Sequence, residues 1–178
     1  MTNSGMFSSL YIEEMKEEVS IHEEAQSRMN TLSGAWKKRE GGTGEGLWNS
    51  FLKQAFSYLE FVPANKGETP LLYPLYEDFG FKDVVSLVGV VPESEELDSV
   101  DIGRFYPAKL IGSLEERELD WGILTNGRLW RLYSRTSSRP FEDYVELDLE
   151  STLEKNDESE YALFEHFFHK DSFVPAEE

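Results

Sequence analysis

The chain has 178 residues, of which 39% are hydrophobic and 13% aromatic. This is enough for one globular domain with a core and too little for two large ones. Acidic residues outnumber basic residues by 35 to 17, and the formal net charge is -18. That charge argues against a nucleic-acid clamp with a uniformly basic surface, because each phosphate contact needs a local cation.

The sequence contains no cysteine, which excludes disulfides, cysteine-based zinc sites and cysteine nucleophiles. The longest apolar runs, such as residues 84–91, are far shorter than the roughly 20 residues of a membrane-spanning helix. The N-terminus lacks the basic and then apolar order of a signal peptide. We therefore expect a cytoplasmic protein without a membrane partner.

The first third of the chain reads as helical. Apolar residues three and four apart predict helix over residues 7–39, in two stretches of which the second runs from His22 to Lys38. The glycine-rich break at residues 41–44 is interpreted as a loop, since a phosphate-binding loop would end in Lys-Ser/Thr. Residues 47–61 then show the clearest amphipathic pattern in the chain.

Two short apolar runs after this helix predict strands. Residues 71–76 and 84–91 are bounded by turn residues and rich in β-branched or aromatic side chains. The second run has no polar alternation, which indicates a strand buried on both faces. An acidic loop at residues 92–101 and a short helix over residues 107–117 are expected to follow.

The most specific local signal is an Asn-Gly pair between two apolar runs. Asn126-Gly127 separates residues 121–125 from residues 128–133, which predicts a β-hairpin whose two turn residues both have positive φ.

The C-terminal part adds a predicted strand at residues 144–149 and a closing helix at residues 157–168. Helices come first, then strands mixed with a helix, then a helix. This order predicts a single α/β (α+β) domain with a mixed central sheet flanked by helices. We expect residues 1–40 to form an N-terminal helical segment and residues 41–178 the main domain.

Arginine is concentrated around the hairpin. Residues 121–139 contain four arginines and no acid, whereas residues 140–165 carry ten acids and one lysine. Beside Trp130 and Tyr133, these arginines can contact a phosphate backbone. They can equally offset the neighbouring acids and cover the sheet edge, and both interpretations stay open. The four residues are Arg128, Arg131, Arg135 and Arg139.

Catalytic chemistry finds no support in the nucleophile and histidine patterns. His166 and His169 are three apart on a predicted helix, a spacing that can hold a metal, but their aromatic surroundings and the lack of a third ligand favour a structural role. No Ser-His-Asp or nucleophile-elbow motif occurs. The sequence therefore predicts no catalytic residue and no metal ligand.

Metal-dependent phosphodiester cleavage needs clustered carboxylates and a lysine, which hold the metal and activate water. In nuclease sheets this requirement takes the form of an acid followed by an acid-x-lysine triplet on a later strand. Among the lysines of this chain, Lys16 alone ends such a triplet, Glu14-Met15-Lys16, and it falls on the predicted N-terminal helix. The strand at residues 84–91 contains no charge.

The hairpin sequence also carries a family resemblance. Residues 121–133 (WGILTNGRLWRLY) closely resemble a signature of type IIG-like restriction-modification enzymes, which join a PD-(D/E)XK endonuclease domain to an adenine methyltransferase. The likeness extends over nearly the whole chain and includes residues 7–14, 51–56, 141–149 and 161–173. The resemblance implies a restriction-endonuclease-like fold, DNA and a methyltransferase domain or subunit as partners, and a role in phage defence.

Both catalytic motifs of that family are missing. In active members an acid follows a proline just before a strand, and the acid-x-lysine triplet ends the next strand. The alignment sets residues 73–76 at the first position and Gly89-Val90-Val91 at the second, while Lys109 stands where the following helix has a glutamine. The resemblance thus implies a nuclease-like fold with its active site erased.

The methyltransferase half is missing as well. No Asn-Pro-Pro-Tyr-type motif and no glycine-rich S-adenosylmethionine loop occurs in the sequence. We therefore expect either the N-terminal piece of a longer protein or a short gene that kept this domain alone.

The leading hypothesis is a catalytically degenerate restriction-endonuclease-like domain, without a cofactor, that serves as a DNA-associated or scaffolding module of a restriction-modification or phage-defence protein. Its DNA-facing candidates are Arg128, Arg131, Arg135 and Lys109.

Two alternatives stay open. One is an active Mg²⁺-dependent DNA endonuclease with a displaced site, which would use Glu77, Asp78 and Lys82 or Asp83. The other is an acidic DNA mimic of the anti-restriction kind, suggested by the net charge and short length.

Overall fold

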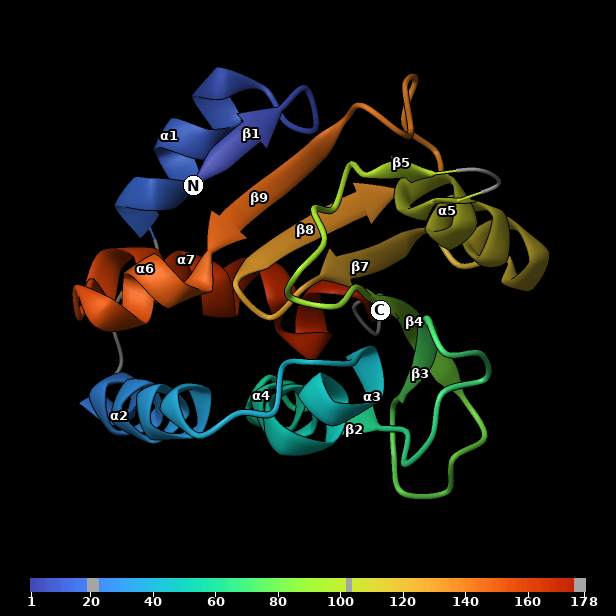
Figure 1. Cartoon of the computed structure of the whole chain (residues 1–178). Helices are drawn as coiled ribbons and strands as arrows, with labels where there is room; N and C mark the ends of the chain where they lie inside the picture. The colour runs from blue at the N-terminus through green and yellow to red at the C-terminus, as the bar shows by residue number, and fades with distance from the viewer. Residues whose placement is uncertain (19–22, 102–103, 175–178) are drawn as a thin grey trace.

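The computed structural model describes residues 1–18, 23–101 and 104–174. Seven strands of these residues form one sheet with the order β1-β9-β8-β7-β4-β3-β2, as Figure 1 shows. These strands are β1 (Thr2–Ser4), β2 (Val62–Pro63), β3 (Leu72–Tyr76), β4 (Val84–Val90), β7 (Trp121–Thr125), β8 (Leu129–Ser134) and β9 (Tyr144–Asp148). A separate two-stranded pair consists of β5 (Val100–Asp101) and β6 (Arg104–Phe105).

The helices of the described residues flank this sheet. They are α1 (Ser9–Glu18), α2 (Glu23–Lys37), α3 (Gly44–Leu47), the π-helical segment η1 (Trp48–Leu52), α4 (Lys53–Tyr58), α5 (Tyr106–Arg117), α6 (Leu149–Glu154), α7 (Glu158–Phe168) and the 3-10 turn η2 (Lys170–Ser172). His22, where the second helical stretch was predicted to begin, lies outside the described residues.

The sheet is mixed because one strand pair is parallel. Strands β4 and β7 run in the same direction, and the chain crosses between them through α5, whereas the other adjacent pairs are antiparallel. A parallel neighbour requires such a crossover connection. The predicted single α/β (α+β) domain with a mixed central sheet flanked by helices is therefore confirmed.

The two faces of the sheet bury different helices. Helices α2, α4, α6 and α7 contribute to a large aromatic core centred on Trp130, whose ring lies 4.9 Å from Phe56 and 4.9 Å from Phe164 between centroids. Helix α5 packs on β4 and β7 in a second core with Leu110 and Leu114. Figure 1 shows α5 apart from the other helices.

Strand β4 contributes to both cores, as its unbroken apolar pattern predicted. Val88 and Val90 belong to the larger core, while Leu87 and Val91 belong to the core under α5. The hydroxyl of Ser86, buried between them, donates to the Trp121 carbonyl at 2.9 Å. A strand covered on both faces needs apolar residues at successive positions, which explains the run at residues 84–91.

The predicted hairpin is present as β7 and β8, but its turn differs from the expected one. Gly127 has a φ of +87°, whereas Asn126 is not among the residues with positive φ. Asn126 instead closes the turn with its side chain, whose Oδ1 accepts from the amides of Arg128 at 3.2 Å and Leu129 at 2.8 Å. Because the side chain replaces a turn hydrogen bond, one glycine suffices.

The predicted amphipathic helix at residues 47–61 is shifted towards the N-terminus. Thr43 caps it, accepting from Gly46 N at 2.9 Å, and the helical residues end at Tyr58. Glu60 then takes a φ of 67°, a left-handed conformation that stops a helix.

Several short elements were not predicted. Strand β1 pairs with β9, so the N-terminal helical segment is joined to the main sheet by its first residues. Strand β2 and helix α6 were also missed, since elements of two to six residues carry little periodicity.

Candidate functional site

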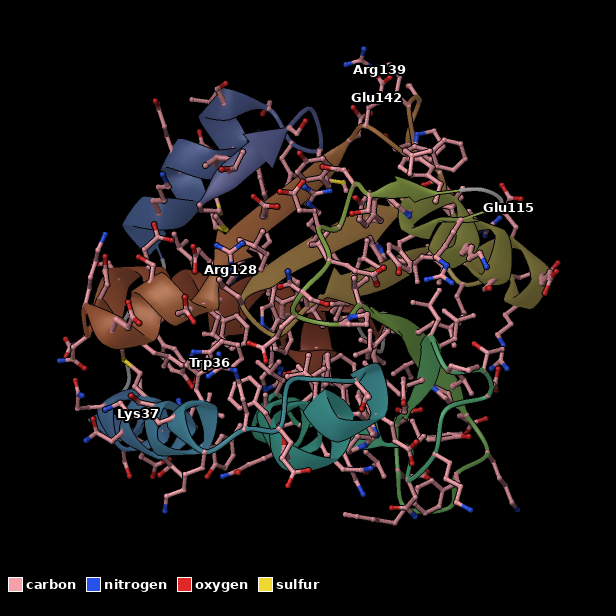
Figure 2. All side chains as sticks on the ribbon, viewed as in Figure 1. Trp36, Lys37, Glu115, Arg128, Arg139 and Glu142 are labelled. Atoms are coloured by element: carbon pink, nitrogen blue, oxygen red, sulfur yellow. The ribbon has the colours of Figure 1, made fainter. Side chains whose placement is uncertain are left out.

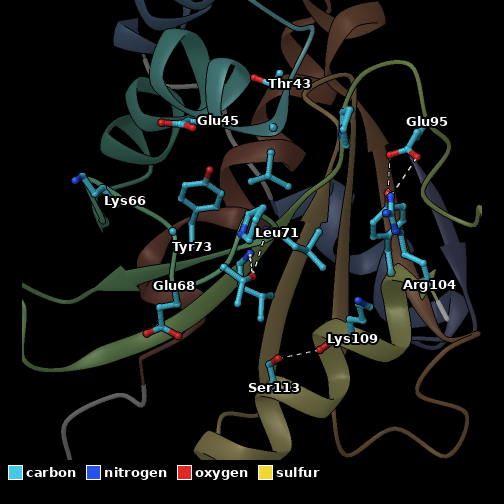
Figure 3. Close-up of a pocket in the computed structure, with 18 of the residues that line it drawn as sticks. Thr43, Glu45, Lys66, Glu68, Leu71, Tyr73, Glu95, Arg104, Lys109 and Ser113 are labelled. Atoms are coloured by element: carbon cyan, nitrogen blue, oxygen red, sulfur yellow. Dashed lines mark hydrogen bonds and ion pairs between the residues drawn. The ribbon is translucent and has the colours of Figure 1, made fainter.

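A pocket of about 1120 Å³ lies where the sheet meets helix α5. One wall is formed by the loop before α3 and the loop between β2 and β3, and the other by α5. Leu71, Leu72 and Val90 line its apolar part. Figure 3 shows side chains from these separate segments converging on the pocket.

This pocket lies at the strand ends where the family resemblance puts the catalytic motifs. Gly89 is in register with Leu72, and Val90 N donates to the Leu71 carbonyl at 2.8 Å. The triplet position Gly89-Val90-Val91 therefore ends beside the start of β3. Its side chains supply no carboxylate and no ammonium group.

Two prolines lie near the first motif position that the alignment gives, residues 73–76. Pro74 lies inside β3 and is buried, whereas the proline just before this strand is Pro70, which is followed by Leu71. Leu71, unlike residues 73–76, also adjoins the end of β4. No acid stands at Leu71 or at residues 73–76.

Packing closes the space that a catalytic acid at position 89 would need. A Cβ atom on Gly89 would lie 2.7 Å from Leu124 Cδ1. Real Cβ contacts are not this short, and Leu124 is itself fully buried in a core that tolerates little added volume. Leu124 would have to repack before any side chain could stand at this position.

Charged side chains of both signs line the pocket. Lys66 on the β2–β3 loop and Lys109 on α5 are exposed. The other charged residues of the lining are Arg104, Glu45, Glu68, Glu95 and Glu116. Tyr73 stacks on Trp48 with 4.3 Å between ring centroids. Burial, aided by the charge of Glu45, raises the pKa of the Tyr73 phenol above its ordinary value, so this hydroxyl stays protonated at neutral pH.

Arginines and lysines are used differently in this protein. Each of the eight arginines lies within 4.0 Å of a carboxylate, while no lysine of the described residues forms such a pair. The pairs include Arg28–Glu165, Arg39–Glu93, Arg104–Glu95, Arg117–Glu68, Arg128–Asp148, Arg131–Asp98, Arg135–Asp120 and Arg139–Glu142. Of the four predicted DNA-facing residues, Lys109 is therefore the one without an acidic partner in the described part of the chain.

Arg131, one of the predicted DNA-facing residues, is covered by other side chains in this structure. Its side chain is 7% exposed and is held by two acids, with Nη1 2.6 Å from Asp98 Oδ1 and Nε 2.7 Å from Glu146 Oε1. The guanidinium also lies 4.1 Å from the centroid of the Tyr144 ring. The alternation of β8 points Arg131 to the sheet face that the 92–101 loop covers, which the sequence did not indicate.

Arg128 and Arg135 are closer to the surface. Arg128, in the hairpin turn, is 45% exposed, and its Nη1 lies 3.9 Å from Asp148 Oδ2, a long contact that water screens. Arg135 donates to the Leu119 carbonyl at 2.9 Å and to Asp120 Oδ1 at 2.8 Å. Figure 2 places Arg128 beside the sheet, well separated from Arg139 on its loop.

The residues suggested for a displaced nuclease site do not form a metal-binding group. Glu77, Asp78, Lys82 and Asp83 are exposed in the turn between β3 and β4, at the opposite end of β4 from the pocket. Asp78 Oδ1 accepts from Gly80 N at 2.9 Å, which is a turn-forming role. In the described chain, the group of three potential ligands found within 4.8 Å is a different one.

That group consists of Glu60, His169 and Asp171. His169 ends α7 rather than lying on it, and its Nδ1 accepts from Asp171 N at 3.1 Å. The side chains of Glu60 and Asp171 are 63% and 79% exposed. His169 thus acts as a helix cap between two solvated acids. The other histidine of this region, His166, is partly buried, which lowers its pKa below the ordinary value.

Sequence reasoning missed Lys66 and Glu45, since no local pattern links the β2–β3 loop and α3 to helix α5. The acidic run at residues 92–101 was visible in the sequence, but its arginine partners were not.

Among the described residues, no helix combines the length and apolar character needed to cross a membrane. No family model, no curated protein and no solved structure matches this chain.

Proposed function

We propose that this chain is a restriction-endonuclease-like domain that has lost its cleavage chemistry and serves as a DNA-associated or scaffolding module of a restriction-modification or phage-defence protein. Its partners would be DNA and a methyltransferase domain or subunit, in the cytoplasm. The proposal requires binding, and it requires neither a catalytic residue nor a cofactor.

The order of elements around the pocket supports this proposal. Strands β3 and β4 are adjacent and antiparallel, and α5 follows them before the chain returns as β7. The family resemblance calls for a first motif at one strand, a second at the end of the next strand, and a third position on the following helix. All three positions adjoin a single pocket.

The observation that carries the proposal is the packing at the second motif position. Leu124 Cδ1 occupies the space next to Gly89, and Val90 and Val91 are buried. A metal-dependent nuclease needs carboxylates at this place to bind Mg²⁺. Here Val90 and Val91 are part of the core, which supports a domain that does not use this cleavage chemistry.

Two lysines give the pocket a means of contacting phosphate. Lys66 and Lys109 stand on opposite rims, exposed and without acidic partners in the described structure. Lysine binds phosphate as a point charge, and such contacts need no uniformly basic surface. Arg128 is the third candidate, because its contact with Asp148 is long and solvated.

The absence of cleavage is tested with supercoiled plasmid and a large excess of protein in Mg²⁺ or Mn²⁺. We expect no nicking above the background of a mock preparation. Nicking that copurifies with the protein and is abolished by Asp78→Asn would instead support the displaced-site alternative, and this part of the proposal would be rejected.

DNA association is tested by fluorescence anisotropy of a labelled duplex over a series of salt concentrations. Binding should weaken as salt rises, with a log–log slope of roughly 0.9 per phosphate contact. Lys109→Ala and Lys66→Ala should each lower that slope by about 1. Lys155→Ala is the matched control, since Lys155 is an exposed lysine at the end of α6, away from the pocket. Equal effects of all three variants would reject the pocket as the DNA site.

A further inference from the structure

The segment from Pro92 to Ser99, here called the acidic strap, connects β4 to the β5–β6 pair. Figure 1 shows it passing in front of β7 and β8, next to α5. It therefore covers the sheet face that α5 leaves open. Leu97 anchors it, being 1% exposed and part of the core under α5.

Three carboxylates of the strap lie on three arginines from different parts of the chain. Glu93 Oε1 is 2.7 Å from Arg39 Nη2, Glu95 Oε1 is 3.7 Å from Arg104 Nη1, and Asp98 Oδ1 is 2.6 Å from Arg131 Nη1. The carboxylates of this acidic segment are thus bound to arginine side chains, and arginine is one of the residues that proteins use to contact the phosphates of a nucleic-acid backbone.

The Asp98–Arg131 pair has the geometry of phosphate recognition. Asp98 Oδ1 and Oδ2 accept from Nη1 at 2.6 Å and from Nη2 at 2.8 Å, a two-point contact of the kind that guanidinium also makes with phosphate. The remaining nitrogen, Nε, is fixed by Glu146. The Arg131 guanidinium is therefore already held in place. Its Nη1 and Nη2 atoms are covered by Asp98, whose own side chain is 55% exposed.

The central part of the strap is held to the sheet by side chains. Its described backbone hydrogen bonds near Asp98 are turns within the strap, from Glu95 N to Pro92 O and from Ser99 N to Glu96 O. The Asn126 side chain donates to the Glu95 carbonyl at 3.4 Å. Segments held in this way open at lower free energy than a paired strand, and ion pairs near the surface weaken with salt.

We propose that the acidic strap is an autoinhibitory element: Asp98 occupies a phosphodiester-binding position on Arg131, and DNA gains that position when the strap is displaced. The inference rests on the proposed function, because it concerns how the same domain associates with DNA. It accounts for a guanidinium, that of Arg131, which is oriented for a two-point contact with an anion and yet covered by the strap.

The test compares Asp98→Asn with Glu96→Gln. Both changes remove one negative charge from the strap, but Glu96 is exposed and forms no ion pair in the described structure. We expect Asp98→Asn to raise the affinity for a labelled DNA duplex by at least about tenfold, and Glu96→Gln by no more than about threefold, the effect of charge alone. Equal affinities of the two variants would overturn the proposal.

A second variant and a second measurement separate the site from general loosening. Adding Arg131→Gln to Asp98→Asn should remove the gain in affinity, because the phosphate position is then lost. Hydrogen exchange at residues 96–99 should be faster in Asp98→Asn than in Glu96→Gln. Unchanged exchange in Asp98→Asn would show that the carboxylate does not hold the strap, which also overturns the inference.

The outcomes distinguish this inference from the proposed function. Wild-type binding through Lys109, with no effect of Asp98→Asn, would leave the DNA-associated module standing and reject the strap. Failure of both wild type and Asp98→Asn to bind DNA would reject both.

Discussion

Gly127 in the hairpin turn packs directly against Trp36 of helix α2: a Cβ atom at position 127 would lie 2.8 Å from Trp36 Cζ3. This contact joins the N-terminal helices to the hairpin that carries the family resemblance. Trp36 is held in turn by its indole N–H, which donates to Glu150 at 3.0 Å. The turn therefore has a packing role as well as a conformational one.

Gly127→Ala should destabilise the protein by about 2 kcal/mol or more, because alanine is strained at positive φ and its methyl group would overlap Trp36. Gly112→Ala is the matched control. Gly112 lies within α5 with nothing near its Cβ position, and alanine there should stabilise by roughly 0.5–1 kcal/mol. Urea unfolding measures both, and a Gly127→Ala protein as stable as wild type would contradict the packing role.

Gly89→Ala should lower the free energy of unfolding by about 1–3 kcal/mol, because the added methyl group would overpack against Leu124. In a Leu124→Ala background, the same substitution should cost clearly less, because the obstructing methyl group is gone. A double-mutant cycle by chemical denaturation gives the coupling between the two positions. Strictly additive effects would mean that Leu124 does not restrict the space beside position 89.

Trp130→Phe should lower the free energy of unfolding by about 1–3 kcal/mol, more than the exchange of one aromatic ring for another would by itself. The Trp130 indole N–H donates to the Gly127 carbonyl at 3.0 Å, and both residues are buried, so phenylalanine would leave that carbonyl without its donor. Thermal and urea unfolding measure the loss. Comparable stability of Trp130→Phe and wild type would show that the carbonyl finds another donor.

The stability that Asp98 contributes should depend on pH in a defined direction. Its hydrogen bonds to Arg131 hold the pKa of Asp98 below its ordinary value, so the ion pair stabilises the folded state fully above the unfolded pKa of about 4. That contribution is lost as the pH falls through the lower, folded-state pKa. The difference in unfolding free energy between wild type and Asp98→Asn should be constant near neutral pH and should shrink below pH of about 4.

The same comparison with Glu96→Gln provides the control, since Glu96 is exposed and lacks an arginine partner in the described chain. At neutral pH, Glu96→Gln should change the free energy of unfolding less than Asp98→Asn does. A pH-independent difference for Asp98→Asn would contradict a charge-based role.

The sequence by itself determined the longer elements of this protein. Helix α7, strands β3 and β4, and the β7–β8 hairpin follow from local periodicity and turn residues, because burial of one face or both imposes a repeating pattern. The apolar triplet Gly89-Val90-Val91 could be read directly, since absent carboxylates need no structure to be recognised.

Tertiary structure alone decided which charges are available. Arg131 and Lys109 looked equivalent as cations in the sequence, yet Arg131 is buried between Asp98 and Glu146, while Lys109 is exposed at the edge of a pocket. Asp98 is far from Arg131 along the chain, and Lys66 is far from Lys109. Coulomb interactions depend on distance in space and on burial, and neither quantity is encoded in the local order of residues.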